Sequence, residues 1–434
     1  MFSMSGVRRT ARCSLIAALV ASACASQAQS APGSADAAAA EAQYRLGLYQ
    51  RETGEPYSAI DTLNSLLASN PSLNRARLEL AVAYYRTLNY ERARAEAQRV
   101  LDDPRTPENV RLSVLSFVKQ MELEQAIAQG QPHKWDINTS VGLLYDSNVN
   151  AGPDNAVLGS SANGLLTLNS QFLSKSDWGY TAQAGVQHTW QRPAPVRIGE
   201  STGRIQWISS LNAYQKGYHN YSDYNLGVLS LATGPGLIVG QGFRGNLNLQ
   251  VDHITFGGHE LGVYTSLNPT VTVRGLGGEI TTDLLVSQRN FSRATDAGRQ
   301  GQFRSFGVSY GRLIGTQASV QGGVRTFVEN TREDRFSNQG HEVFVGGRIQ
   351  WAGIDFFARS ALRNARYDGV EPVFNVARSE LERRNEVGAS YSFLEGWLQK
   401  WQLSATLANV HNRSNVSLYG YDRDTAFINL SRTF

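Results

Sequence analysis

The chain has 434 residues, of which 41% are apolar and 18% charged, and it carries a formal net charge of +4. This composition excludes a collagen-like, a wholly disordered and a disulfide-stapled protein. The longest apolar run, residues 14–25, is shorter than the ~20 residues of a membrane-spanning helix, which excludes a helical membrane protein. A membrane β-barrel stays open, because its alternating strands contain no long apolar run.

The first 28 residues have the pattern of a secretory signal peptide. Three arginines precede a short apolar stretch, and small residues follow it up to Ala28, the expected cleavage site. Both cysteines, Cys13 and Cys24, lie in this segment, and lipidation of Cys24 is an open alternative. The mature chain then lacks cysteine and holds 38 basic and 37 acidic residues. This balance removes disulfides, thiolate metal sites and an electrostatic motive for binding nucleic acid. Residues 29–40 are expected to form a flexible spacer.

Residues 41–130 are rich in Ala, Leu, Glu and Arg, have helical periodicity and repeat at 34 residues. Leu46-Gly47 recurs as Leu80-Ala81, and Pro71 and Pro104 end the two units. The pattern resembles the tetratricopeptide repeat, followed by a capping helix from about residue 106 to 129. The resemblance implies a groove that binds a segment of a client protein, whereas the alternative is a spacer of ordinary solvated helices. The expected groove positions are Tyr44, Leu48, Arg51, Arg75, Leu78, Val82, Tyr85 and Arg86.

From residue 133 to 434 the hydrophobic pattern alternates with a period of two. Ile137, Val141 and Leu143, for example, share one face of the first expected strand. Each run has about ten residues, the length of a strand that crosses a bilayer. Aromatic residues near the ends of the runs match the girdles of a membrane barrel. The tryptophans among them are Trp135, Trp178, Trp190, Trp351, Trp397 and Trp401.

The connectors are expected to alternate in length, as in a bacterial outer-membrane barrel. Tight turns are expected at 233–236, 275–278, 314–316 and 352–353, and long loops at 292–301, 329–340, 367–381 and 411–421. The unbroken alternation disfavours the alternative of a soluble β-sandwich or propeller. The predicted fold is therefore an α + β membrane protein, a short tetratricopeptide-repeat domain followed by a transmembrane antiparallel β-barrel.

The strand count has two solutions, fourteen or sixteen, because both ends of the barrel must lie on one side of the membrane. Fifteen segments show alternating apolar and polar residues. We assign one of them, residues 163–174, to the first extracellular loop, which leaves fourteen strands. Pro269 falls inside one of them, where it removes a ladder hydrogen bond. The chain ends in Phe434, expected to be read by the barrel-assembly machinery, although Arg432 interrupts the apolar pattern of this last strand.

Charged residues of the alternating half must face the lumen, because a charge on the lipid side costs ~2–4 kcal/mol at the bilayer midplane. Both signs occur, so no strong ion selectivity is expected. The expected lumen-facing charges are Asp283, Arg289, Arg325, Glu329, Arg348, Asp355, Arg359 and Arg363.

The sequence offers no catalytic, cofactor or metal site. Gly307–Gly311 matches the Gly-x-Ser-x-Gly pattern, but it lies within an alternating run and not at a strand–turn–helix junction. The seven histidines are scattered, without the spacing of a metal site. We therefore expect no enzyme activity and no cofactor.

Two short segments resemble the surface lipoprotein assembly modulator (Slam) family. Residues 142–150, Gly-Leu-Leu-Tyr-Asp-Ser-Asn-Val-Asn, look like the family's first barrel strand, and residues 221–231 are similar to its early loop-to-strand segment. The resemblance implies an outer-membrane translocator of type XI secretion, with a periplasmic helical domain. Its expected partners are a client secreted protein or lipoprotein, periplasmic chaperones and outer-membrane lipids. The alternatives are an exopolysaccharide exporter, which normally carries many more repeats, and a general porin.

Overall fold

The computed structural model describes residues 35–128, 132–160 and 164–434. The expected signal peptide, with Cys13 and Cys24, lies outside these residues. The chain divides into two compact units. One contains residues up to 132 together with 191–205, and the other contains 133–190 and 206–434.

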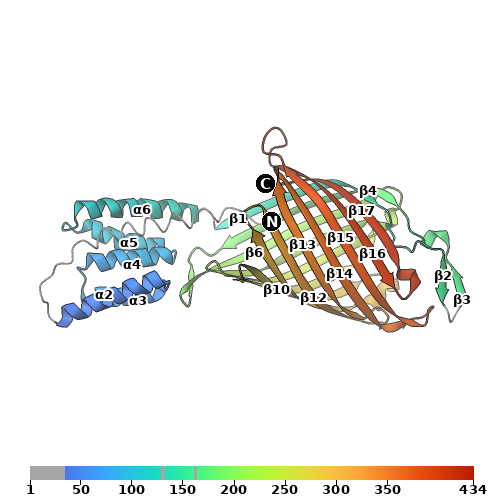
Figure 1. The fold of residues 1–434 in the computed structure, drawn as a ribbon, viewed down its shortest axis with the longest axis horizontal. Coiled ribbons are helices and arrows are strands. Elements are labelled where there is room, and N and C mark those ends of the chain that lie inside the picture. The colour runs from blue at the N-terminus through green and yellow to red at the C-terminus, as the bar shows by residue number, and fades with distance from the viewer. Residues whose placement is uncertain (1–34, 129–131, 161–163) are drawn as a thin grey trace. The chain divides into compact units, whose positions relative to one another are not determined.

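The first unit is a stack of helices in which each helix packs against the next (Figure 1). Residues 35–40, expected in a flexible spacer, instead form the first turns of the first helix, because consecutive alanines have the highest helix propensity. None of the described helices is both long enough and apolar enough to cross a bilayer. The helices are α2 (Ala35–Thr53), α3 (Pro56–Ser69), α4 (Asn74–Arg86), α5 (Tyr90–Asp102) and α6 (Glu108–Ala128).

Small residues of the repeat allow these helices to approach one another closely. Ala59, Ala81 and Ala93 are fully buried. A Cβ at Gly47 in α2 would lie 2.8 Å from Cδ2 of Leu63 in α3, so any larger side chain would push the two helices apart. The repeat pattern in the sequence is thus a pattern of helix contacts.

The start of α3 is capped by a residue far away in the sequence. Pro56 occupies its first turn, and the helix has no side-chain cap of its own. Instead, the Glu200 carboxylate, from the same unit, accepts hydrogen bonds from the backbone N–H groups of Tyr57 (2.9 Å) and Ser58 (3.1 Å). The Ser58 hydroxyl donates a third, at 2.8 Å. An anion at a helix N-terminus satisfies its free N–H groups and complements its dipole.

The second unit is a closed antiparallel barrel of fourteen strands, as predicted (Figure 1). Strand β4 pairs with both β1 and β6, which closes the ring, and β5 (Val196–Ile198) adds only a short pairing to β6. The fourteen are β1 (His133–Asp146), β4 (Asp177–Gln191), β6 (Ser201–Tyr218), β7 (Leu226–Val239), β8 (Phe243–Phe256), β9 (His259–Gly275), β10 (Gly278–Phe291), β11 (Gly301–Ile314), β12 (Ala318–Thr331), β13 (Asn338–Trp351), β14 (Ile354–Glu371), β15 (Val376–Ser392), β16 (Trp401–Ser414) and β17 (Tyr421–Thr433).

The segment assigned to the first loop does not enter the barrel. Strands β2 (Val157–Ser160) and β3 (Gly164–Thr167) form a separate two-stranded sheet. The two ends of the barrel meet: Asn138 is paired with Thr433, and the Phe434 N–H donates to the Ile137 carbonyl at 2.8 Å. Both ends therefore lie at one rim, as an even strand count requires.

The prediction of a tight turn at residues 233–236 is wrong. These residues continue β7, and the turn follows at 240–242. Pairing between β7 and β8 is recorded at Thr233 and again at Gly236, so Pro235 falls in a short gap of the ladder and does not end the strand. At 352–353 the expected turn is present, with φ of 52° at Ala352 and 79° at Gly353, the left-handed pair that suits a two-residue hairpin.

The strands are longer than the expected ten residues, at 13 to 18 each, and the long loops are correspondingly shorter. The segment 367–381 shows this most clearly, because β14 runs to Glu371 and β15 begins at Val376. Outside the bilayer neither face of a strand meets lipid, so strict alternation of polar and apolar residues is not required there. The backbone ladder continues nevertheless, because it does not depend on side-chain polarity.

Pro269 lies inside β9, and a neighbouring side chain replaces its missing donor. Pairing of β9 with β10 is interrupted between Thr270 and Leu267. In this gap the Asn268 side-chain amide donates to the Leu284 carbonyl of β10 at 2.7 Å. The carbonyl opposite proline thus keeps a hydrogen bond, which explains why a central strand tolerates proline.

Candidate functional site

Arg75 links the first helices of the two repeats on the expected groove side. Its guanidinium pairs with Glu41 of α2 and lies 4.5 Å from the centre of the Tyr44 ring. Burial raises the pKa of Glu41, but hydrogen bonds and charges from Arg45 and Arg75 outweigh this effect and hold the pKa below its usual value. The Arg75 side chain is 38% exposed, so a bound segment could reach it.

Arg51 and Glu79 form an ion pair buried between α2 and α4. Their Nε and Oε2 atoms lie 2.7 Å apart, but the geometry does not form an aligned hydrogen bond. Burial raises the pKa of Glu79, and the Arg51 charge opposes this shift. Arg86 donates to the Arg51 carbonyl oxygen, and burial lowers the pKa of Arg86. With 3% exposure, Arg51 joins two helices and does not line an open groove, contrary to the expectation.

Other expected groove residues also belong to the interior of the stack. Leu78 and Val82 are each 3% exposed and lie in the helical core, and Leu48 is half-buried. The Tyr85 hydroxyl donates to Glu124 of α6 at 2.7 Å, and its ring packs edge-on against Phe117. The consensus spacing overlooked how tightly neighbouring helices pack around these positions.

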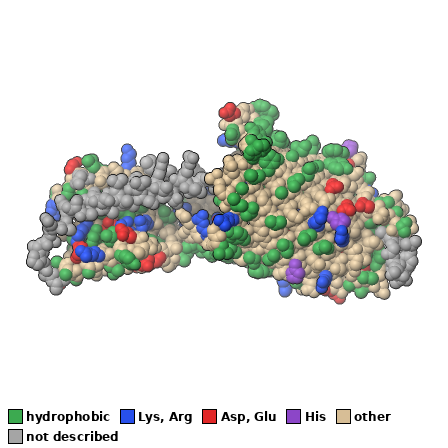
Figure 2. Space-filling model, viewed as in Figure 1, with side chains coloured by type: hydrophobic (Ala, Val, Ile, Leu, Met, Phe, Trp, Pro, Cys, Tyr) green, Lys and Arg blue, Asp and Glu red, His purple; other side chains and the backbone are tan. Residues whose placement is uncertain are grey.

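Alternate side chains of each barrel strand point outward and inward. Val141 and Leu143 of β1 are 58% and 65% exposed, and Val345 of β13 is 62% exposed. Figure 2 shows such hydrophobic side chains spread over the barrel face. A face rich in exposed apolar side chains suits lipid, so the opposite face of each strand lines the lumen.

Charged side chains on the inward faces of β10–β15 lie in pairs. Arg289 Nη1 lies 2.6 Å from Glu329 Oε1, and Arg325 Nη2 lies 3.0 Å from Asp283 Oδ2. The second pair spans β11, where a Cβ at Gly307 would lie only 3.3 Å from Arg325 Nε. The glycine therefore lets charges on next-but-one strands meet.

The remaining expected lumen charges lie on the same wall. Arg348 Nη2 is 2.6 Å from Asp355 Oδ2. The Arg359 guanidinium lies 4.8 Å from the centre of the Phe344 ring, and Arg363 lies 4.5 Å from that of Phe327. Cations alternate with acids or rest on aromatic rings, so this wall presents polar groups without a large excess of either sign.

A second part of the lumen wall, formed by β4 and β6–β9, has a hollow whose lining includes no charged side chain among the described residues. The hollow has a volume of about 420 Å³ and is lined by amide, hydroxyl and aliphatic groups. The composition of the sequence gave no sign of it, because single Asn and Ser residues are unremarkable until neighbouring strands bring them together. The polar side chains that line it are Gln187, Ser210, Asn212, Ser230, Asn246, Asn248, Gln250, Asn268 and Thr270.

The two segments that resemble the Slam family meet at one end of the barrel. Asp146, fully buried at the end of β1, accepts hydrogen bonds from Arg423 Nε (2.9 Å) and the Tyr218 hydroxyl (2.5 Å). Leu144, Val149 and Tyr218 form a small apolar core beside it. Tyr221 and Tyr224 of the second segment pack against this core, whereas the buried carboxylate joins the first segment to β6 and β17.

Asparagines of the same segment fix the connector after β1. Asn148 is fully buried and donates to the carbonyls of Gly152 (2.8 Å) and Asp422 (2.9 Å). Asn150 donates to the Leu173 carbonyl at 2.8 Å. We call Asp146, Asn148, Asn150, Tyr218 and Arg423 the loop clasp. The Asp-x-Asn-x-Asn spacing therefore pins a long connector to the barrel end.

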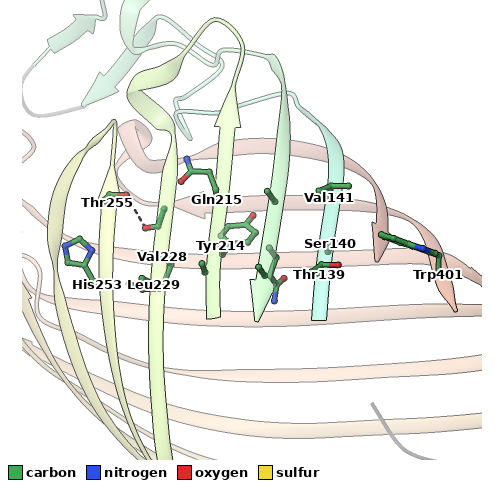
Figure 3. A pocket seen from close by; sticks show the side chains of 15 residues that line it. Thr139, Ser140, Val141, Tyr214, Gln215, Val228, Leu229, His253, Thr255 and Trp401 are labelled. Carbon is green, nitrogen blue, oxygen red and sulfur yellow. Dashed lines mark hydrogen bonds between the residues drawn. The ribbon is translucent and has the colours of Figure 1, made fainter. Parts of the chain in front are cut away.

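A further hollow of about 570 Å³ spans β1, β4 and β6–β8, with Trp401 of β16 at its edge (Figure 3). Small residues, among them Ala182, Ala184 and Ala213, share its lining with Val141 and Leu229. Within it the Thr255 hydroxyl donates to the Gly227 carbonyl at 3.5 Å, the dashed line in Figure 3. Because Val141 and Leu229 belong to the exposed apolar face, we place this hollow on the lipid side.

The terminal strand accommodates Arg432 through aromatic contacts. Its guanidinium lies 4.4 Å from the centre of the Phe434 ring and 5.8 Å from that of Trp401. An arginine stacked on rings at the barrel rim can keep its charge near water. Recognition of Phe434 by the assembly machinery stays a prediction.

Chemical sites are sparse in residues 35–128, 132–160 and 164–434. No group of three or more His, Cys, Asp or Glu side chains in these ranges could hold a metal ion. The Gly-x-Ser-x-Gly sequence lies in the middle of β11, as expected.

Comparison with known proteins gives partial matches. A tetratricopeptide-repeat family model matches residues 41–72. No curated protein matches the chain. The barrel is similar to solved outer-membrane channels. Pseudomonas aeruginosa OccK3 (OpdO) is 13% identical, with 69% of this chain and 96% of that chain covered and a TM-score of 0.33. For the outer membrane channel DcaP of Acinetobacter baumannii these values are 10%, 70%, 97% and 0.39.

Proposed function

We propose that the protein is an outer-membrane translocator that moves client proteins from the periplasm to the cell surface. The observation that carries the proposal is the union, in one chain, of a tetratricopeptide-type helical unit with a closed fourteen-strand barrel. A barrel that only admits small solutes has no need of a protein-binding repeat, whereas a translocator must select its clients. The helical unit would lie in the periplasm and contact the client or a periplasmic chaperone.

The accessible surface of the helical unit suits such contacts. Arg75, beside Tyr44, offers a cation and an aromatic ring on the groove side. Leu46 and Tyr49 of α2 are 49% and 63% exposed, and Leu112 of α6 is 59% exposed. A helical unit that offers both exposed apolar side chains and an accessible cation suits an amphipathic protein segment as the ligand.

Deletion of residues 41–130 tests this role. We expect the barrel to remain in the outer membrane, with its folded form still resistant to SDS at room temperature, while one or a few proteins disappear from the surface proteome of intact cells. A matched control is Arg45→Ala, which alters an exposed side chain of the same unit, 77% accessible, and should leave the surface proteome unchanged. An unchanged surface proteome in the deletion strain would refute the proposed function.

A general channel is the second candidate, favoured by the polar lumen wall. Liposome swelling in small sugars separates the two. A general channel admits sugars at a rate that the helical deletion does not alter, whereas a translocator at rest should admit them poorly.

A further inference from the structure

The uncharged hollow of the lumen wall has the features of a built binding surface. Its lining contains neither a charged nor an aromatic side chain among the described residues. The neighbouring wall of β10–β15, in contrast, is occupied by ion pairs such as Arg325–Asp283 and Arg348–Asp355. A ligand of this hollow therefore meets amide, hydroxyl and aliphatic groups, and its polar groups are recognised by hydrogen bonds and not by ion pairs.

Several polar groups in the hollow are available for a ligand. Asn268 and Gln250 are committed, to the Leu284 carbonyl and to Asp252 respectively. Asn212, Asn246 and Asn248, in contrast, have no side-chain hydrogen bond to any residue that the structure describes. Asn212 and Asn248 are half-buried and Asn246 is exposed. Amides without protein partners are satisfied by solvent or by ligands.

Glycines on adjacent strands hold these amides against the wall. A Cβ at Gly236 of β7 would lie 2.7 Å from Asn246 Oδ1, and a Cβ at Gly185 of β4 would collide with Asn212 Oδ1. Because glycine has no side chain, the space beside Gly236 and Gly185 is free for the amides of Asn246 and Asn212. The amides are therefore held at fixed places along the strands.

Their spacing fits an extended polypeptide. Residues two apart on a strand, such as Asn246 and Asn248, repeat at about 6.7 Å, and the backbone N–H and C=O groups on one side of an extended chain repeat at the same distance. Each amide supplies one donor and one acceptor face, which matches the peptide group. A carbohydrate would favour aromatic stacking platforms, and none lines this hollow.

We propose that an extended, uncharged stretch of polypeptide binds along this wall through its backbone, with Asn212, Asn246 and Asn248 as the principal contacts. The inference rests on the proposed function and deepens it, because it names the conformation in which a client passes the barrel. Backbone recognition is independent of side-chain sequence, so one wall serves different client segments.

The test uses the purified full-length mature chain in detergent. The probe is a fluorescently labelled 24-residue peptide of Gly, Ser and Thr, and the competing probe is labelled maltohexaose. We expect saturable binding of the peptide by fluorescence anisotropy, weakened about tenfold in the triple variant Asn212→Ala, Asn246→Ala, Asn248→Ala. The matched control is Leu249→Ala, Val251→Ala, which alters two exposed residues of β8 outside the hollow and should leave affinity unchanged.

A photo-crosslinking amino acid supplies a second readout if the triple variant does not fold. Placed at position 248 it should capture the peptide, and placed at 249 it should not. Saturable binding of maltohexaose in place of the peptide would reassign the wall to carbohydrate and overturn the inference. Equal peptide affinity in the triple variant, or capture at 249 but not at 248, would also overturn it.

The translocator role and the peptide-binding wall can be refuted independently of each other. Should the surface proteome be unaffected by the helical deletion while the peptide still binds at the wall, the translocator role is wrong and the binding surface stands. Should surface proteins depend on the helical unit while the peptide ignores the wall, only the inference fails.

Discussion

The Asp146 carboxylate is fully buried and joins three parts of the barrel end, through Arg423, Tyr218 and the Asn148 backbone. We expect Asp146→Asn to lower the free energy of unfolding by about 3 kcal/mol, because Arg423 then keeps a largely buried charge without its partner. The expected value lies at the lower end for buried pairs, since 26% of the Arg423 side chain is exposed. The measurement is the urea midpoint of the loss of the SDS-resistant folded form.

Asp136→Asn is the control for this prediction. Asp136 lies on the same strand and pairs with Lys134, whose side chain is 71% exposed, so its loss should cost less than about 1 kcal/mol. Equal shifts for the two substitutions would mean that the loop clasp does not stabilise the barrel end.

The pairing of β9 with β10 depends on the Asn268 side-chain amide, which donates a hydrogen bond where Pro269 has no backbone N–H. Asn268→Ala leaves the Leu284 carbonyl without its donor, and we expect it to cost about 1–2 kcal/mol. Adding Pro269→Ala restores the backbone N–H, so the double variant should recover most of this loss. A double-mutant cycle on urea midpoints measures the coupling. Additive effects of the two substitutions would show that the amide does not replace the proline donor.

Helix α3 begins against the Glu200 carboxylate, and this contact makes its first turn sensitive to acid. Burial raises the pKa of Glu200, but hydrogen bonds from Ser58 and Tyr57 and the charge of Arg197 outweigh it, so the pKa is lowered from 4.5. A carboxyl group with a lowered pKa in the folded state contributes stability above its unfolded pKa and loses it as the pH falls through the folded value. The first turn of α3 should therefore loosen below about pH 4.5.

Hydrogen exchange of the Ser58 and Ala59 amides in the full chain measures this effect. After correction for intrinsic exchange rates, protection should fall on acidification in the wild type. In Glu200→Gln it should be lower at neutral pH and nearly independent of pH. Glu41, whose pKa is also lowered, is common to both proteins and cancels in the difference. A parallel loss of protection in the variant would contradict the assignment to Glu200.

Helices and strands could be predicted from the sequence wherever the residues repeat with a local period. The alternation of Val141 and Leu143 marked the lipid face, and the repeated small residues marked the helix pairs. Strand ends were not predictable in this way, because the backbone ladder of β14 and β15 continues where polarity no longer alternates. The loop clasp was not predictable either, because Asp146 and Arg423 are 277 residues apart and nothing local links them.

At the scale of the whole molecule, fourteen strands place the start of β1 and Phe434 at the same rim, so every connector has an assigned side. Connectors after β6 and β12 lie at the opposite rim, and those after β7 and β11 lie at the rim of the termini. The only cysteines of the chain, Cys13 and Cys24, fall in the expected signal peptide, so single cysteines can report these sides in an otherwise cysteine-free protein.

Labelling of intact cells with a membrane-impermeant maleimide tests this topology. Ser222→Cys and Arg332→Cys, after β6 and β12, should be labelled at once. Gln241→Cys and Thr316→Cys, after β7 and β11, should react only when the outer membrane is permeabilised, and Arg45→Cys in the helical unit should behave like them. All five positions are exposed, so failure to react reports the membrane barrier and not burial. Labelling of Arg45→Cys on intact cells would place the helical unit outside and remove the basis for periplasmic client selection, whereas labelling after β7 but not after β6 would invert the barrel.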